Sequence, residues 1–356
     1  DEDLELQIIA TGAHLSPEFG LTYKVIEADG FEIDEKVEML LSSDTAVGIT
    51  KSLGLATIGF ADAYDRLKPD IVILLGDRYE MLAAAQAALI IGLPIAHIGG
   101  GDTTEGAFDE AIRHSITKMA HIHFVTNELS ARRIRQLGEN PQYIFNVGSP
   151  GIDYIKRVKL LNRRDLEKEL EFEFQDKNLL ITFHPVTLDR GSSLHQFMEL
   201  LKALDSLGTD IGIIFTKANA DPEGRSINQM IEKYVESHPK AKAYTSLGQV
   251  KYFSVIAQVD AVVGNSSSGL YEVPSFGKPT VNIGDRQKGR LQAASIINCQ
   301  SQASAIKQAI ISAFDMDCSN VQNPYGDGTS SIKMLSILKS IPDYKALLKK
   351  QFFVME

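Results

Sequence analysis

Five stretches of the chain place polar or charged side chains directly after a run of apolar residues. In open α/β sheets ligands bind just beyond the carboxyl ends of the strands, so chemistry is expected at such places. The stretches hold carboxylates, a histidine, hydroxyls and arginines, which move protons or bind anions. They are Gly76-Asp77-Arg78, residues 97–114, Phe183-His184-Pro185, residues 215–221, and residues 263–272 with 284–290 downstream.

The first two stretches carry carboxylates suited to general acid or base chemistry. Asp77 ends an apolar run where a helix is expected to begin, and taken alone it is equally well explained as a helix N-cap. In the second stretch, Gly99-Gly100-Gly101 allows unusual backbone angles and the close approach of a ligand. Four acidic residues follow these glycines within the stretch: Asp102, Glu105, Asp109 and Glu110.

The spacing of two of these acids, Glu105 and Asp109, places them on one helix face. A helix that begins near Glu105 puts Asp109 one turn later and Arg113 one turn beyond that. In an isolated helix this pattern is typical of a solvated ion-pair ladder. Its position after three glycines at a strand end favours a functional site instead.

The second half of the chain adds a histidine and a polar loop. His184 stands at a strand's carboxyl end, before a proline that cannot extend the sheet. A lone histidine is usually structural, but here it could act as an acid, a base or a phosphate partner near neutral pH. Residues 215–221, which include Asn219, are better explained as a surface loop.

The stretch 263–272 predicts an anion-binding turn. A strand is followed by a glycine, three serines, another glycine and a helix, so backbone N–H groups, hydroxyls and the positive helix end converge. A simple N-cap needs only one serine. Glu272 could reach a sugar diol, and Arg286, Lys288 and Arg290 favour a phosphate-rich ligand. The turn itself comprises Asn265, Ser266, Ser267, Ser268 and Gly269.

The elements that must position these residues are short Val- and Ile-rich runs alternating with helical patterns of ten or more residues. The alternation predicts an α/β fold of doubly wound parallel sheets, covered on both faces by helices. The densely charged stretch 156–177 predicts a domain boundary near the middle of the chain. The last helical pattern could belong to either domain.

Length, charge and cysteine content exclude several classes of protein. With 356 residues the chain has room for two domains, and its formal charge of -10 argues against nucleic acid or anionic membrane as partners. Its only cysteines, Cys299 and Cys318, indicate a reducing cytoplasm and no disulfide framework. The sequence contains no dinucleotide fingerprint, no phosphate-binding P-loop, no Cys/His metal spacing, no signal peptide and no membrane span.

The ordered set of motifs resembles the hydrolysing UDP-N-acetylglucosamine 2-epimerases of bacterial sialic and legionaminic acid synthesis. Each motif is weak alone, but the set covers nearly the whole chain in the family's order. The matching segments are Gly76-Asp77-Arg78, residues 97–118, His184-Pro185, residues 264–269 with Glu272, and residues 286–290.

The resemblance implies a glycosyltransferase-B type fold, with two Rossmann-like parallel-sheet domains facing a cleft. The implied domains are an N-terminal one over 1–160 with the acids, a UDP-binding one over 177–338, and a helix over 339–356 that crosses back to the first. Relatives begin with a further strand and a Gly-Thr/Ser-Arg turn, and by this resemblance a strand-plus-helix unit of roughly 25 residues is missing ahead of Asp1. Its loss would damage the sheet and the activity.

The resemblance also implies a reaction. A base removes the C2 proton of the sugar while UDP leaves C1, and water adds to the resulting 2-acetamidoglucal to release N-acetylmannosamine. Asp77 and Asp109 match the family's catalytic acids, with the base left open between them, and Arg113 and His114 match their neighbours. Many relatives carry a glutamate where this chain has Gly99; either Asp102 or Glu105 replaces it, or its role is distributed over other residues.

For the nucleotide, the resemblance implies that His184 lies near the diphosphate, that Ser266, Ser267 and Gly269 hold the phosphates, and that Glu272 holds the ribose. No metal or other cofactor is expected, and the family is expected to form homodimers or homotetramers. The remaining candidates for UDP contact are Asn219, Ser246, Asn265, Ser268, Arg286 and Arg290.

Four alternatives remain. A non-hydrolysing 2-epimerase would return its product still attached to UDP and would release no UDP. A close variant takes UDP-2,4-diacetamido-2,4,6-trideoxyglucose for legionaminic acid, and the different sugar pocket around Gly99 is consistent with it. A glycosyltransferase on the same scaffold would need an acceptor, against which the carboxylate cluster argues. A non-catalytic sugar-nucleotide binding module would leave Asp77 and Asp109 as helix caps.

Overall fold

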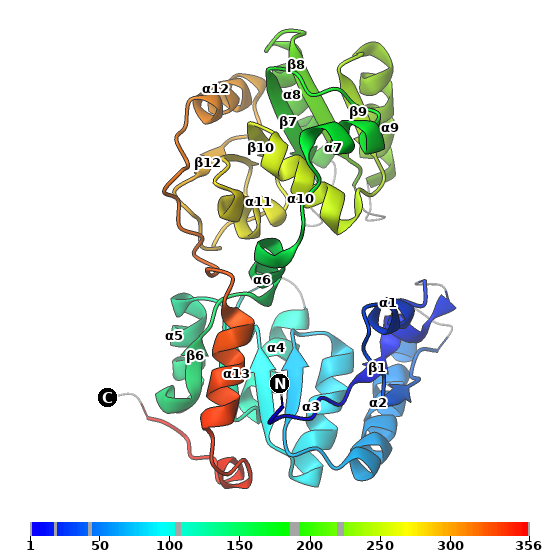
Figure 1. The fold of residues 1–356 in the computed structure, drawn as a ribbon, viewed down its shortest axis with the longest axis vertical. Coiled ribbons are helices and arrows are strands. Elements are labelled where there is room, and N and C mark those ends of the chain that lie inside the picture. Colours follow the sequence, from blue (N-terminus) through cyan, green and yellow to red (C-terminus); the bar gives the residue numbers. More distant parts are fainter. Residues whose placement is uncertain are drawn as a thin grey trace. The chain divides into compact units, whose positions relative to one another are not determined.

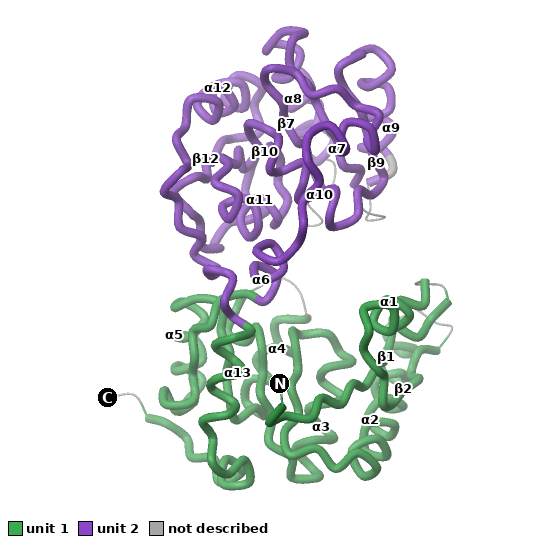
Figure 2. The backbone as a smooth tube through the Cα atoms, viewed as in Figure 1, with its two compact units in different colours: residues 1–149, 331–356 green, residues 150–330 purple. Residues whose placement is uncertain are grey.

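A computed structural model describes residues 2–17, 20–41, 45–103, 108–185, 192–218 and 224–354. The chain divides into two compact units (Figure 2): unit 1 comprises residues 1–149 and 331–356, and unit 2 comprises residues 150–330. Each unit has its own sheets and its own apolar core. Within the described ranges, none of the helices combines the length and the apolar content needed to cross a lipid bilayer.

Unit 1 builds its main sheet from four parallel strands in the order β3-β4-β5-β6, and a separate parallel pair from β1 and β2. Its elements are β1 (Ile9–Thr11), the 3-10 helix η1 (Gly12–Leu15), α1 (Tyr23–Ala28), β2 (Glu35–Val37), α2 (Ala46–Leu67), β3 (Val72–Leu75), α3 (Tyr79–Ile91), β4 (Ile95–Ile98), α4 (Phe108–Met119), β5 (Ile122–Val125), α5 (Glu128–Gln136), η3 (Pro141–Tyr143), β6 (Ile144–Asn146), α13 (Ser330–Ser340) and η5 (Lys345–Leu348).

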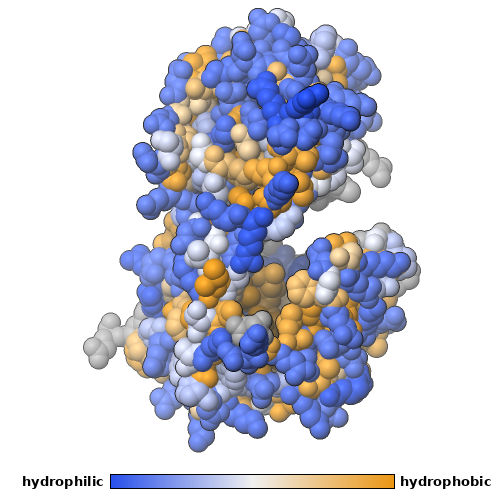
Figure 3. Space-filling model, in the orientation of Figure 1, coloured by the Kyte–Doolittle hydropathy of each residue, from blue (hydrophilic) through white to orange (hydrophobic). Residues whose placement is uncertain are grey.

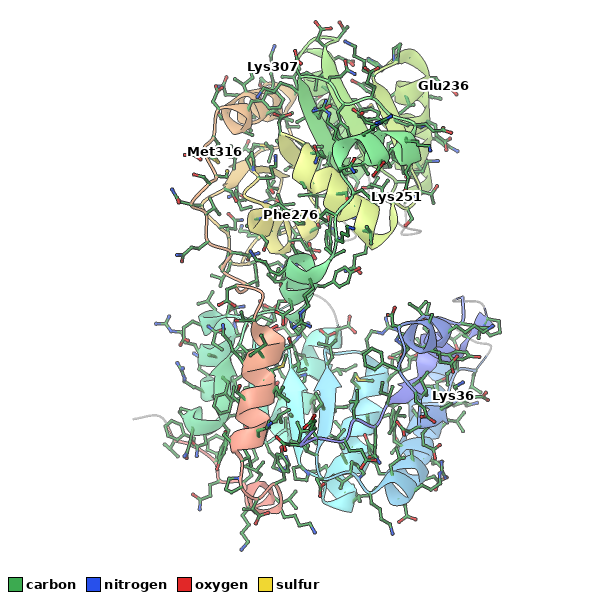
Figure 4. The ribbon with its side chains drawn as sticks, in the orientation of Figure 1. Lys36, Glu236, Lys251, Phe276, Lys307 and Met316 are labelled. Carbon is green, nitrogen blue, oxygen red and sulfur yellow. The ribbon has the colours of Figure 1, made fainter. Side chains whose placement is uncertain are left out.

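Local sequence explains where the helices of unit 1 begin and end. The Thr45 hydroxyl accepts a hydrogen bond from the Gly48 N–H at 3.1 Å, which caps α2. The helix α3 is rich in alanine and packs closely against α2, and it ends at Gly92, whose φ of 84° favours glycine. On β2, Lys36 pairs with Glu27 of α1 at 3.3 Å (Figure 4).

Not all of the apolar surface of unit 1 is covered. β3 is an edge strand of the four-stranded sheet, and alternate residues on it, Ile73 and Leu75, are 47% and 62% exposed. Figure 3 shows apolar side chains gathered on this face of unit 1, over α3 and the strands beside it.

The end of the chain packs on unit 1. Leu338 and Leu347 share a core cluster with Ala96 of β4 and Phe124 of β5 (Figure 1). The α-helix predicted over 339–356 is not found among residues 341–354. α13 ends at Ser340, because Pro342 cannot continue a helix, and only the short η5 follows it among residues 341–354.

Unit 2 holds one six-stranded parallel sheet in the order β12-β11-β10-β7-β8-β9. Numbered within the unit, this is the Rossmann order 3-2-1-4-5-6, and the order reverses between β7 and β10. The elements are α6 (Pro150–Arg157), α7 (Arg163–Leu170), β7 (Lys177–Thr182), α8 (Ser192–Asp205), β8 (Ile211–Thr216), α9 (Gly224–Ser237), β9 (Ala241–Tyr244), α10 (Gly248–Gln258), β10 (Ala261–Gly264), α11 (Ser268–Tyr271), η4 (Val273–Phe276), β11 (Thr280–Ile283), β12 (Ile296–Cys299) and α12 (Ala303–Phe314).

The sheets confirm the predicted fold class, because every strand pair described is parallel and apolar helices cover the sheets. The charged stretch 156–177 lies inside unit 2, where it forms the end of α6, the whole of α7 and the first residue of β7. Charge there reflects the outer face of α7, whose Leu166 and Leu170 are buried.

Buried histidines should make unit 1 sensitive to acid. Burial lowers the pKa of His97 and of His121 to about 4, and it lowers the pKa of His123 as well. The unfolded chain therefore binds more protons than the folded one below about pH 6.5. The free energy of unfolding of unit 1 is expected to fall between about pH 6.5 and pH 4, with His97 alone contributing about 3 kcal/mol.

Hydrogen exchange of the full chain between pH 7.5 and pH 4.5 measures this effect. The amides of β4 and β5 should lose protection before those of β7 and β10, and a His14→Gln control on the exposed His14 should behave as the parent protein does. Equal loss of protection in both units would contradict the prediction.

Candidate functional site

Asp77 and Arg113 form a charge pair at the carboxyl end of β3. Asp77 follows Gly76, whose φ of 83° turns the chain after the strand. The Arg113 guanidinium donates to Asp77 Oδ2 through Nε at 2.9 Å and also through Nη2. The Arg113 side chain is only 6% exposed and that of Asp77 is 28% exposed. The pairing therefore holds one carboxylate oxygen on a buried cation and leaves Asp77 Oδ1 with no partner among the described residues.

The glycines after β4 allow the backbone to pass close to this pair. Gly99 and Gly101 have φ values of 83° and 76°. A Cβ on Gly100 would lie 2.8 Å from Thr117 Oγ1, and one on Gly101 would lie 2.3 Å from the Ser130 carbonyl. The next carbonyl, that of Asp102, accepts from Arg113 Nη1 at 2.8 Å. The same arginine thus ties the glycine turn to Asp77.

His97 contacts the turn after β3 and packs beside the glycine turn after β4. Its ring is fully buried, with Nε2 2.8 Å from the Gly76 carbonyl and Nδ1 3.3 Å from Thr117 Oγ1. Because burial lowers the pKa of His97 to about 4, the ring is neutral near pH 7. A neutral ring with one N–H can donate to the carbonyl and accept from the hydroxyl, and so positions the residue before Asp77.

Asp109 lies in the first turn of α4, four residues before Arg113. The pKa of Arg78 is raised mainly by its hydrogen bond to Glu80, and the negative charge of Asp109 adds to this. α3 and α4 also pack against one another in unit 1. Asp77, Asp102, Asp109 and Arg113 thus belong to one polar region of unit 1, whereas Glu105 lies outside the described residues.

In unit 2, His184 and Asn265 meet where the strand order reverses. The His184 N–H donates to Asn265 Oδ1 at 2.7 Å, and Asn265 Nδ2 donates to the His184 carbonyl at 2.8 Å. Asn265 is fully buried. Gly264, before it, has a φ of 145°, and a Cβ there would lie 1.9 Å from the Thr182 carbonyl. Only glycine lets β10 turn against β7 at this point.

The predicted serine turn follows directly. Ser266, Ser267 and Ser268 are partly exposed at the start of α11, and Ser268 accepts a hydrogen bond from the Tyr252 hydroxyl at 2.8 Å. Burial raises the pKa of Glu272, and a hydrogen bond with Ser268 partly offsets this. Glu272 Oε2 is buried without a hydrogen-bond partner among the described residues. A ligand with hydroxyl donors would satisfy it.

The segment after β11 is anchored to the same turn. Arg286 Nη1 and Gln287 Nε2 donate to the Asn265 carbonyl at 3.1 and 2.8 Å. Arg290 donates to Gln287 Oε1 at 2.7 Å, and its guanidinium lies 5.5 Å from the centroid of the Tyr271 ring. Two cations are thereby held beside the serine turn.

Sequence reasoning did not single out His97, Thr117, Tyr252 or Gln287 as positioning residues. His97, Thr117 and Gln287 stood inside segments already marked, but nothing in residue type showed that they would be buried. Of the other candidates, Ser246 is exposed and its hydroxyl accepts from the Gly248 N–H at 3.2 Å, next to α10. Asn219 lies outside the described residues.

Within the described residues, no group of three or more His, Cys, Asp and Glu side chains has the arrangement needed to hold a metal ion. The polar region of unit 1 offers a carboxylate with a free oxygen next to a cation. The region of unit 2 offers N–H groups, hydroxyls and arginines for an anion, and an unsatisfied carboxylate for hydroxyls. The first suits proton transfer, and the second suits a nucleoside diphosphate.

Comparison with known proteins agrees with this chemistry. A family model described as UDP-N-acetylglucosamine 2-epimerase matches residues 1–339. The chain is 49% identical over 301 residues to the GDP/UDP-N,N′-diacetylbacillosamine 2-epimerase (hydrolyzing) of Campylobacter jejuni, covering 84% of this chain and 78% of that protein. It is 35% identical to the UDP-N,N′-diacetylbacillosamine 2-epimerase (hydrolyzing) of Legionella pneumophila, covering 98% and 92%.

Among solved structures, the chain resembles the putative UDP-N-acetylglucosamine 2-epimerase of Listeria monocytogenes, with a TM-score of 0.77 at 17% identity, over 95% of this chain and 96% of that one. The likeness shows that the fold, two Rossmann-like α/β units in one chain, is that of the solved protein. Together with the match over residues 1–339, it identifies the chain as a member of the UDP-N-acetylglucosamine 2-epimerase family and as an enzyme, a UDP-sugar 2-epimerase of the hydrolysing type.

Proposed function

We propose that the enzyme converts UDP-N,N′-diacetylbacillosamine and water to UDP and the free 2-epimeric sugar. This substrate is UDP-2,4-diacetamido-2,4,6-trideoxyglucose, which the sequence alone placed second. The observation that carries the choice is the 49% identity to the Campylobacter jejuni protein of that name. UDP-N-acetylglucosamine is the second candidate, supported by the name of the family.

The acids of unit 1 are proposed to transfer the C2 proton of the sugar. Asp77 and Asp109 are the residues proposed to move the C2 proton, and Asp77 is the better placed because Arg113 occupies only its Oδ2. As the C2–H bond breaks, its electrons form the C1–C2 double bond, and the C1–O bond breaks with the electron pair leaving on UDP. Water then adds its oxygen to C1, and a proton returns to C2 from the opposite face. Asp102 and Glu105 are proposed to assist this second step.

The serine turn of unit 2 is proposed to bind the diphosphate of the UDP leaving group. The diphosphate is proposed to lie on the N–H groups and hydroxyls of Ser266, Ser267 and Ser268, with Arg286, Arg290 and His184 neutralising the charge that develops. Asn265 and Gly269 shape this turn, and Asn219 and Ser246 are proposed as further nucleotide contacts. The support is the anchoring of residues 286–290 on the Asn265 carbonyl.

Proton NMR of the full chain in deuterated buffer tests the reaction, with UDP-N,N′-diacetylbacillosamine, its GDP counterpart and UDP-N-acetylglucosamine run in parallel. The expected result is free sugar carrying deuterium at C2 with one equivalent of UDP, formed fastest from the UDP-diacetylated substrate. Faster turnover of UDP-N-acetylglucosamine would reject the substrate and keep the reaction. Product that remains attached to UDP would reject hydrolysis.

Replacing Glu272 by glutamine is expected to weaken UDP binding about tenfold or more, because a buried carboxylate that accepts from the ribose hydroxyls contributes more than a neutral amide. Since burial raises the pKa of Glu272, UDP affinity of the parent protein should also fall as the pH is lowered and the carboxylate takes up a proton. Isothermal titration calorimetry measures both effects. Glu236→Gln on the exposed surface of α9 (Figure 4) is the matched control and should bind UDP normally.

We also propose that the protein works in the cytoplasm as a homodimer or homotetramer, on a route to an acidic nine-carbon sugar such as sialic or legionaminic acid. Support for the compartment comes from Cys299 and Cys318, neither of which forms a disulfide. Light scattering coupled to gel filtration tests the assembly, and a monomer at micromolar concentration would reject it.

A further inference from the structure

A pocket of unit 1 lies away from the residues proposed to serve the reaction. Its volume is about 150 Å³, large enough for a group of several heavy atoms. It lies at the amino-terminal ends of β5 and β6, whereas Asp77 and the glycine turn follow the carboxyl ends of β3 and β4. Its wall on the other side is the segment that follows α13. The residues that line it include His121, His123, Asn140, Tyr143, Lys349 and Lys350.

The floor of this pocket is a charge cluster in which the Glu139 carboxylate is fully engaged, while His123 Nδ1 is buried without a hydrogen-bond partner among the described residues. Glu139 accepts from Lys118 at 2.6 Å, from Lys350 at 2.6 Å and from His123 Nε2 at 3.0 Å. Burial alone would raise the pKa of Glu139, but these hydrogen bonds lower it to about 2. Lys350 also donates to the carbonyls of Lys118 and Ala120 at 2.6 and 2.7 Å. Two ammonium groups thus surround one carboxylate, which leaves a net positive charge.

The groups around the cluster are hydrogen-bond donors. His121 is 7% exposed, and its Nδ1 accepts from the Ile95 N–H at 3.1 Å, so its Nε2 carries the proton. Asn140 Oδ1 accepts from the Gln142 N–H at 3.0 Å, which leaves the Asn140 amide N–H groups as donors. Within the described part of the chain, His121 Nε2, Asn140 Nδ2, the Tyr143 hydroxyl and Lys349 Nζ have no hydrogen-bond partner. His121 is buried and Tyr143 is partly buried, whereas Asn140 and Lys349 lie exposed on the rim, where a bound anion would take the place of water.

We propose that this pocket binds a small oxyanion, a phosphate or a carboxylate group, held by His121, Asn140, Tyr143 and Lys349 above the Lys118–Glu139–Lys350 cluster. A cation does not suit it, because the lysines already outnumber the carboxylate. The pocket is separate from the sugar-nucleotide site, but α4 reaches both. Arg113 on α4 binds Asp77, and Lys118 in the last turn of the same helix binds Glu139.

The test is a titration of the UDP-saturated full chain with inorganic phosphate and, separately, with acetate. UDP fills the serine turn, so that phosphate bound there cannot be mistaken for phosphate in the pocket. The readout is the ¹⁵N shift of the His121 ring, assigned with His121→Gln. A saturable shift is expected below about 0.15 M anion. Saturation by phosphate alone assigns a phosphate group, and saturation by acetate assigns a carboxylate.

Variants on the rim locate the binding. Lys349 is exposed, so Lys349→Gln should fold normally and weaken anion binding about two- to fivefold. Tyr143→Phe should weaken it about three- to tenfold through loss of one hydrogen bond. Lys51→Gln, on an exposed lysine of α2 in the same unit, should have no effect. The proposal is overturned if neither anion shifts His121, or if the shift is the same in all three variants.

Discussion

Asp77→Asn is expected to lower turnover by about 10² to 10⁴-fold, the usual worth of one positioned acid or base. Asparagine has the size of aspartate and can still accept a hydrogen bond from Arg113, but it cannot take a proton from C2. UDP should bind with unchanged affinity, because the turn proposed to hold it belongs to unit 2. The measurement is single-turnover release of UDP, with deuterium uptake at C2 followed in parallel.

A matched control separates catalysis from the loss of a surface charge. Asp29→Asn, on an exposed aspartate of unit 1, should retain full turnover. Circular dichroism at the assay temperature shows whether Asp77→Asn is still folded, since Arg113 keeps its bond to the Asp102 carbonyl in the variant. A folded Asp77→Asn protein with at least a third of the parent turnover would rule out Asp77 as an acid or base.

Gly264→Ala is expected to have the largest effect on stability. The new Cβ would lie 1.9 Å from the Thr182 carbonyl, and the φ of 145° strains any other residue. Because Gly264 and Thr182 are register partners in β10 and β7, the strands would have to separate. We expect the free energy of unfolding of unit 2 to fall by about 4 kcal/mol. UDP binding should be lost as well, because the hydrogen bonds between Asn265 and His184 would break.

Gly208→Ala is the control for backbone strain alone. Gly208 has a φ of 100° and nothing within 4 Å of a Cβ built there. It should cost about 1 kcal/mol and leave UDP binding intact. Urea unfolding followed by hydrogen exchange in β7 and β10 measures both variants. Equal losses in the two would show that the close approach of β10 to β7 does not matter.

Much of the scaffold was open to prediction from local patterns. Alternating apolar runs and helical periods predicted the parallel α/β class, because each period depends on residues near one another in the chain. The rule that ligands bind beyond the carboxyl ends of strands marked Asp77, His184 and Asn265, which follow β3, β7 and β10. The glycine and serine turns could also be predicted from the sequence, because the backbone freedom of glycine and the hydrogen-bonding groups of serine depend on residue type alone.

The start of α4 and the boundary between the two units were harder to predict from the sequence. The helix expected near Glu105 is described from Phe108, and Asp109 and Arg113 lie within it as the spacing suggested. The charged stretch 156–177 belongs to the compact unit 2, because α7 buries Leu166 and Leu170 despite its charged outer face. Charge density reports the exposed side of an element, not whether the element is a linker.

By itself, the sequence determined the fold class, the family and the short turns that can hold an anion or a carboxylate, since each depends on the order of neighbouring residues. Only the tertiary structure decided which of these residues meet. Arg113 reaches Asp77 across 36 residues, Asn265 reaches His184 across 81, and Lys350 reaches the Ala120 carbonyl across 230. Such pairs arise because strand order and the return of the chain end bring distant segments to one edge of a sheet, and no local pattern specifies that order.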